Sequence, residues 1–197
     1  MSLGLLASAF GLIFVAELPD KTMIATIVMG SRGNPRAVWL GASAAFVAQM
    51  ALACAAGQLL NLLPRTVIEV VVTILFLGGA AYLLLVSEEE EIEEGLEEAE
   101  SERPSTSLRT ARTAFVIIFI AEFGDLTQIL AASLAARSNQ PFTIFVASSL
   151  ALVAIAALGS FGGSALLRVL PLARIRQLSG VLLLGIGIFT LVSIFTG

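Results

Sequence analysis

The sequence predicts an all-α integral membrane protein, with six transmembrane helices arranged as two inverted three-helix repeats. Three observations predict this class. Hydrophobic residues make up 57% of the 197 residues. Charged residues make up only 13%, whereas roughly a quarter is usual in soluble domains. A short acidic motif near the N-terminus also occurs a second time, about halfway along the chain.

Six apolar windows are each long enough to cross a hydrocarbon core about 30 Å thick. Short connections rich in turn-forming residues separate them, such as Gly30–Pro35 and Arg137–Pro141. The N-terminus lacks the positively charged start of a signal peptide, so we expect the first window to be a retained span. The windows are residues 3–29, 38–61, 66–86, 113–136, 141–167 and 177–196.

The two halves share a motif. Phe14–Thr22 (FVAELPDKT) aligns with Phe119–Thr127 (FIAEFGDLT), and the two segments share Phe, Ala, Glu, Asp and Thr at the same spacing. Each half contains three windows, which is an odd number, so the second half would enter the membrane from the opposite side. The halves would then be inverted repeats, as in many secondary transporters. We expect repeats at 1–86 and 113–197, joined by a linker at 87–112.

Basic residues predict the orientation of the chain in an inner (cytoplasmic) membrane. Only Arg65 and Arg137 would lie on one side, whereas eight arginines would lie on the side of the linker. Cytoplasmic segments are enriched in Lys and Arg, so the linker should be cytoplasmic and both termini outside. The eight are Arg32, Arg36, Arg103, Arg109, Arg112, Arg168, Arg174 and Arg176.

The linker carries ten Glu and three Arg. Like charges at this density repel one another and keep a segment solvated. It is either a plain tether between the halves or a regulatory loop that attracts divalent cations toward an entry path.

The composition also excludes several functions. The chain has no His, which excludes His-ligated metals and His-based catalysis, and its single Cys54 cannot form an intrachain disulfide. The sequence contains neither a glycine-rich phosphate loop nor a basic nucleic-acid patch. We therefore expect no bound cofactor and no nucleic-acid partner.

Four carboxylates fall inside the predicted spans: Glu17, Asp20, Glu122 and Asp125. Each costs at least about 2.5 kcal/mol to insert at the centre of a membrane helix, so acids in this position usually serve a function. Spacing of i,i+3 places the two acids of a pair on one helix face. Two such pairs brought together by inverted symmetry would offer hard oxygen ligands to Ca²⁺, Mn²⁺ or Mg²⁺.

The residue between the two acids should weaken each helix. Pro19 lacks a backbone donor, and Gly124 is a poor helix former at the matching place. In an unbroken helix Thr22 and Thr127 would face away from the acids and bond to the backbone instead. In a broken helix their hydroxyls, and freed backbone carbonyls, could join the cation site.

The two motifs differ in charge. Lys21 follows Asp20 and can neutralise Glu17, whereas Leu126 stands at the matching place in the second half. We therefore expect the second motif to contribute more of the cation-binding charge. Weaker candidates for the same cavity are Lys21, Ser43, Gln49, Gln128 and Ser149. For Ser43, Gln49 and Ser149, interhelical hydrogen bonding is the alternative role.

At these motifs the chain resembles the Gdt-type Ca²⁺/Mn²⁺:H⁺ antiporter family, whose motif E-x-G-D-K/R-S/T occurs in each of two three-helix halves joined by an acidic loop. The resemblance covers essentially the whole chain and implies a bacterial member. It implies Mn²⁺ or Ca²⁺ as substrate, protons as counter-ion, and a cation site formed by the motif residues. Pro19 and Leu126 depart from the motif, which leaves ion preference and proton stoichiometry open. The implied ligands are Glu17, Asp20, Thr22, Glu122, Asp125 and Thr127.

The function expected is exchange of divalent cations for protons, in the direction of cation export. The main alternative is another small-solute or metal exporter of the lysine-exporter type, which would bind Mn²⁺ and Ca²⁺ poorly. A membrane-embedded enzyme using Asp20 and Asp125, or a structural subunit, is disfavoured because these acids belong to a duplicated motif. Expected partners are membrane lipid and divalent cations, and small-residue helix faces would also permit a homodimer.

Overall fold

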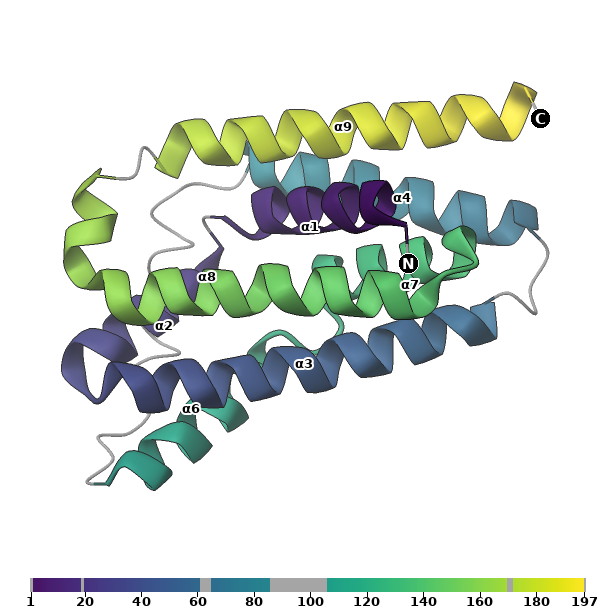
Figure 1. Ribbon diagram of the computed structural model, residues 1–197. Coiled ribbons are helices and arrows are strands. Elements are labelled where there is room, and N and C mark those ends of the chain that lie inside the picture. Colours follow the sequence, from purple (N-terminus) through teal and green to yellow (C-terminus); the bar gives the residue numbers. More distant parts are fainter. Residues whose placement is uncertain (1, 19, 61–64, 86–105, 170–171, 197) are drawn as a thin grey trace.

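A computed structural model of the chain describes residues 2–18, 20–60, 65–85, 106–169 and 172–196, which form eight α-helices (Figure 1). Most of the predicted linker, residues 87–105, lies outside the described residues. The helices are α1 (Leu3–Glu17), α2 (Lys21–Arg32), α3 (Pro35–Leu60), α4 (Arg65–Leu85), α6 (Ser107–Ala121), α7 (Leu126–Ser138), α8 (Pro141–Val169) and α9 (Leu172–Thr196).

The first and fourth predicted spans are each divided into two helices. α1 and α2 meet at 73°, and α6 and α7 meet at 74°. Within the described residues, α3 and α8 are long and apolar enough to cross a membrane, and each bent pair can count as one further span. α4 and α9 occupy the third and sixth predicted windows, but many of their side chains are outside the described part of the chain. The chain is thus an all-helical protein of membrane type, and the six-span arrangement stays a prediction.

Local sequence signals explain where several helices begin and end. The Ser2 hydroxyl accepts a hydrogen bond from the Leu5 N–H, and the Thr106 hydroxyl accepts one from the Arg109 N–H, each at 3.4 Å. Such N-cap bonds satisfy donors that a helix start leaves free. The second cap starts α6 at Ser107, within the range assigned to the linker.

The two halves pack against each other in the same way: the long second-span helix of each half packs on the broken first-span helix of the other half. α3 of the first half packs on α6 and α7, and α8 of the second half packs on α1 and α2. Small residues allow this close approach: Gly41 lies directly against the backbone of Ala111, and Gly159 lies against Thr26. α3 and α8 also contact each other and cross the molecule in opposite directions (Figure 1).

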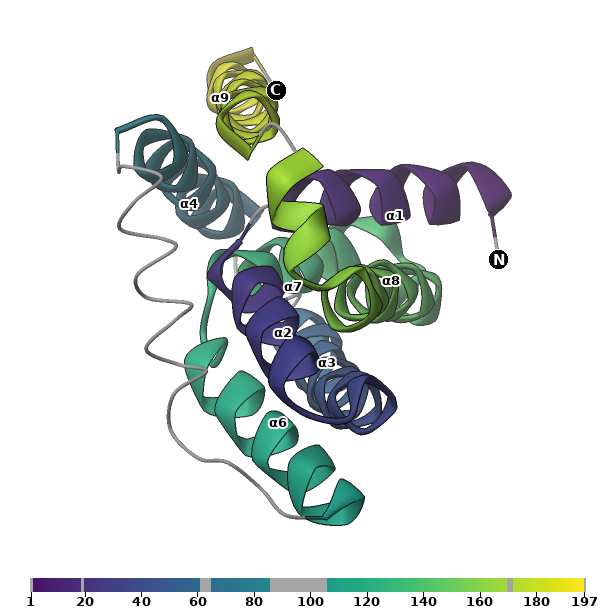
Figure 2. The same ribbon diagram turned by 90° about the vertical axis from the view of Figure 1, so that its left-hand side faces the viewer.

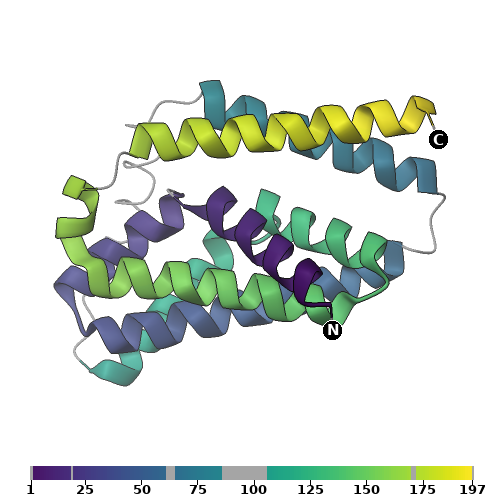
Figure 3. The ribbon, with the colours of Figure 1, turned by 45° about the horizontal axis from the view of Figure 1, so that its top comes forward.

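α4 and α9 form a separate helical pair. They lie along each other (Figures 1 and 3), and Figure 2 shows the pair beside the bundle formed by α2, α3 and α8. Their contacts with the rest of the described chain are limited, chiefly α4 with α7 and α9 with α1. Gly79 of α4 is where this pair meets α7, since a side chain there would collide with Leu126.

Candidate cation site

The two helix breaks position the four acids. Glu17 is the last residue of α1 and Asp20 is the N-cap of α2; Glu122 follows α6 and Asp125 is the N-cap of α7. The acids of a pair were predicted to share one face of a continuous helix. That prediction was wrong in its cause, because the chain leaves the helix between them and they flank a bend instead.

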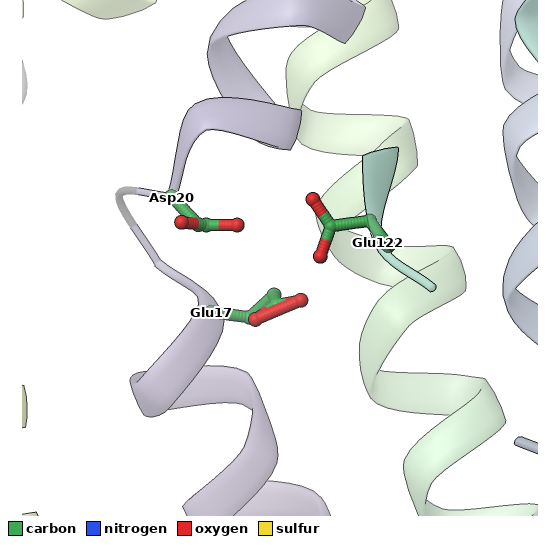
Figure 4. A group of neighbouring side chains, drawn as sticks. All are labelled: Glu17, Asp20 and Glu122. Carbon is green, nitrogen blue, oxygen red and sulfur yellow. The ribbon is translucent and has the colours of Figure 1, made fainter. Parts of the chain in front are cut away.

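Three of the acids converge from both halves of the chain. One carboxylate oxygen from each of Glu17, Asp20 and Glu122 lies within 4.8 Å of the other two. Figure 4 shows these side chains directed toward one another, with Glu17 and Asp20 on one break and Glu122 on the other. Glu17 is 3% exposed and Glu122 is 1% exposed, so water screens the cluster poorly. Glu122 interacts in turn with Asp125.

The threonines of the motifs bond across the two halves. The Thr127 hydroxyl donates to Glu17 Oε2 at 2.8 Å, and the Thr22 hydroxyl donates to Glu122 Oε1. Each half therefore supplies a donor to the glutamate of the other half. Both threonines are buried, and the breaks turn them toward the acids instead of away from them. A second oxygen of Glu122, Oε2, is buried without a hydrogen-bond partner among the described residues.

Helix ends of both polarities meet at this site. Asp20 and Asp125 are the N-caps of α2 and α7, and a helix N-terminus stabilises a nearby carboxylate. α1 and α6 end beside them, and the carbonyl-rich C-terminus of a helix favours a cation. Broken membrane helices bind ions in this way in several transporter folds. The geometry is therefore suited to anionic ligands that hold a positive ion.

A cavity of about 470 Å³ adjoins the acids. The motif residues form one side of it, and α4 forms the other through Ile74, Gly78 and Gly79. Lys21 also lines the cavity, within electrostatic range of Glu17 and Asp20 and also of Asp125 in the other half. The contribution of α4 was not predicted, because the third window was treated only as a span. Its Gly-Gly pair was a usable signal, since adjacent glycines in a membrane helix often mark a close approach.

The two glutamine candidates bind the backbone of α6 and its break. Gln49 of α3 donates to the carbonyl of Phe119 at 3.1 Å. The Gln128 Nε2 donates to the carbonyl of Glu122 at 2.6 Å, and its Oε1 accepts from the Gly124 N–H at 3.3 Å. Gln49 thus forms an interhelical hydrogen bond, the alternative role considered for it, and Gln128 forms hydrogen bonds to the loop between α6 and α7.

The two serine candidates make no described contact with the acids. Neither Ser43 nor Ser149 is among the described residues that line the cavity. Both hydroxyl oxygens are buried, and neither has a hydrogen-bond partner in the described part of the chain. The structure therefore brings together the six motif residues and Lys21, and leaves these two serines outside.

The apolar helices and the buried acidic centre define a multi-pass membrane protein. A model of the family described as "Divalent cation/proton antiporter GDT1" matches residues 5–91 and 110–197. The chain belongs to this family, which is a family of transporters and not of enzymes.

Several similar curated proteins come from plants. GDT1-like protein 3 of Oryza sativa subsp. indica is 28% identical over 201 residues, which cover 93% of this chain and 72% of that protein. GDT1-like protein 3 of Arabidopsis thaliana is 27% identical over 202 residues, which cover 93% of this chain and 69% of that protein. Protein PAM71, chloroplastic, of Arabidopsis thaliana is 27% identical over 212 residues, covering 96% of this chain and 57% of that protein. No solved structure matches the chain.

Proposed function

We propose that the chain exports Mn²⁺, Ca²⁺ or both in exchange for protons, and that the motif residues form the cation site. The observation that carries this proposal is the convergence of carboxylates from both halves within 4.8 Å of one another. Ca²⁺ binds oxygen ligands at about 2.3–2.6 Å, so oxygens spaced in this way can share one ion. The proposed ligands are Glu17, Asp20, Thr22, Glu122, Asp125 and Thr127.

Competition at the acids would couple the ion to protons. Clustered carboxylates in a poorly screened cavity repel one another. Either a divalent cation or protons relieve that repulsion, so binding of one favours release of the other. The unpartnered Oε2 of Glu122 is buried in this cluster, where it is available to either.

The membrane arrangement that we propose is six spans in two inverted repeats. The matching packing of α3 and α8, each against the broken helix of the other half, supports this arrangement. The reciprocal Thr–Glu hydrogen bonds also support it. Inverted repeats commonly give alternating access by rocking one part of the molecule against another around a central site. The α4–α9 pair has few contacts with the remaining described helices and also lines the cavity through α4, so it is the element best placed to move.

The test is cation flux in liposomes that contain the purified protein. With an acidic lumen, proton efflux should drive uptake of Mn²⁺ or Ca²⁺, and an ionophore that dissipates the pH gradient should abolish it. Asp20→Asn and Asp125→Asn should each reduce the flux by at least tenfold, because each removes one charge from the buried site. Glu98→Gln, an acid-to-amide change in the linker, is the matched control and should leave flux near wild type.

The relative effects also test the asymmetry between the motifs. Lys21 belongs to the first motif and Leu126 stands at its place in the second. We therefore expect Asp125→Asn to reduce transport at least as much as Asp20→Asn, even though Lys21 also lies within electrostatic range of Asp125. A clear reversal would contradict this. Absence of Mn²⁺ and Ca²⁺ flux in folded wild-type protein would instead favour an exporter of another solute, of the lysine-exporter type.

A further inference from the structure

We propose that Gln128 is a positioning residue, which fixes the second helix break so that Glu122 is held in the cation site. This inference rests on the proposed function, since it assigns a residue to the same site. It differs from a ligand role, because the side-chain amide of Gln128 is already engaged by the backbone.

Three hydrogen bonds link Gln128 to the break. Its Nε2 donates to the Glu122 carbonyl at 2.6 Å, and its Oε1 accepts from the Gly124 N–H at 3.3 Å. Its own backbone N–H donates to the Asp125 carboxylate at 2.9 Å. One residue thus binds the backbone before and at the bend and the acid after it, which ties together the short segment that carries Glu122 and Asp125.

The position of this segment determines what Glu122 can reach. Glu122 crosses to the other half, where Oε1 accepts from Thr22, and its Oε2 stays available in the buried cluster. The amide of Gln128 gives the Glu122 carbonyl a second donor, in addition to the Asp125 N–H at 3.3 Å. The backbone carbonyl of Glu122 is therefore hydrogen-bonded to the Gln128 amide, and the carboxylate of Glu122 is the group that faces the site.

The first break lacks this amide. Met23 stands at the position that matches Gln128, and Pro19 stands where the second half has Gly124. A proline restricts its own backbone angle through its ring, whereas glycine allows many angles and so needs external support. Gly124 takes φ +84°, and Gln128 bonds directly to its N–H. The glutamine thus supplies from a side chain the restriction that proline provides covalently in the first half.

The experiment replaces Gln128 in the full-length protein and measures cation dependence. Gln128→Met removes both side-chain bonds and copies the residue of the first half. Gln128→Glu keeps an acceptor for Gly124 but loses the donor to the Glu122 carbonyl. We expect each change to raise the apparent KM for Mn²⁺ about tenfold, with maximal flux within about twofold of wild type, because each removes the part-buried bond to the Glu122 carbonyl.

A second readout does not depend on transport. Mn²⁺ should raise the melting temperature of wild type, because a ligand that binds only the folded state stabilises it. Both Gln128 variants should need about tenfold more Mn²⁺ for the same rise. Gln58→Met, the same exchange at an exposed position of α3, is the matched control and should behave as wild type in both assays.

The outcomes separate this inference from the proposed function. Wild-type protein without divalent flux or thermal response would contradict the proposed function. Wild-type transport with an unchanged KM in Gln128→Met would overturn the positioning role alone. If Gln128→Glu matches wild type while Gln128→Met fails, the bond from Gln128 to the Glu122 carbonyl is not needed, which overturns the role of Gln128 in holding Glu122.

Discussion

At the scale of single residues, the motif threonines join the halves of the protein. Thr127 donates to Glu17 and Thr22 donates to Glu122, and all four side chains are buried. A carboxylate oxygen removed from water needs such a donor, or a cation in its place. Each hydroxyl therefore fixes a glutamate of the opposite motif, and its oxygen keeps a lone pair that can face an ion.

Replacing either threonine by valine should weaken the site. Valine has nearly the same shape but no hydroxyl, so it leaves a buried carboxylate oxygen unsatisfied, at about 1–3 kcal/mol. Thr22→Val and Thr127→Val should each lower Mn²⁺- or Ca²⁺-dependent flux at least tenfold, while the serine variants retain most of it. Thr110→Val, which removes only a bond to the carbonyl of Thr106 on the same helix, should transport normally. Normal flux in both motif variants would contradict a role for these hydroxyls.

At the scale of elements, the break in each motif helix creates the site. The sequence was sufficient to predict a weak point at Pro19 and Gly124, because one residue lacks an N–H and the other lacks a side chain. Bends of 73° and 74° could not be predicted, since an angle depends on what the two helix segments pack against. The i,i+3 argument predicted the right acids for the wrong reason: Glu17 and Asp20 face the site from opposite sides of a bend.

Gly124→Ala tests whether the bend at the second motif requires glycine. At φ +84° an alanine is strained by roughly 1–3 kcal/mol. A Cβ there would touch no atom of the described residues within 4 Å, so the effect is due to the backbone alone. The variant should unfold at lower temperature and transport poorly. Gly11→Ala, inside α1 and also unobstructed, should be at least as stable as wild type because alanine favours helix. Equal stability of the two variants would contradict this explanation.

At the scale of the whole molecule, the positions of the long helices could be predicted from the sequence, whereas the contacts between helices could not. Apolar windows located the long helices to within a few residues, because hydrophobic length is a local property. The wall that α4 adds to the cavity depends on Gly79 meeting Leu126, a contact between residues far apart in sequence. Likewise, the motif repeat indicated two acidic pairs, but only the packing of α3 and α8 shows how they approach each other.

Two long-range hydrogen bonds bear on the orientation of the chain. The Ser2 N–H donates to Gln140 at 3.1 Å, which joins the N-terminus to the connection before α8. Asn34 donates to Ser107 at 3.1 Å, which joins the connection before α3 to the start of α6. The start of α3 and the end of α8 lie together at the left of Figure 1. The molecule therefore has two opposite faces, one at the Ser2–Gln140 bond and one at the Asn34–Ser107 bond. The arginines of the described residues are concentrated at the face with Asn34 and Ser107.

This division predicts which cysteines a membrane-impermeant maleimide can label. In a Cys54→Ser background, Ser2→Cys and Asn139→Cys should react from outside intact cells with the protein in the inner membrane. Ser107→Cys should react only after permeabilisation, because arginine-rich segments face the cytoplasm. All three positions are exposed in the structure, so burial does not account for a difference. The opposite labelling pattern would show that the protein is inserted the other way round. Labelling of Ser2→Cys and Asn139→Cys from different sides would contradict the proposed span arrangement itself, since the hydrogen bond between Ser2 and Gln140 requires both segments on one side.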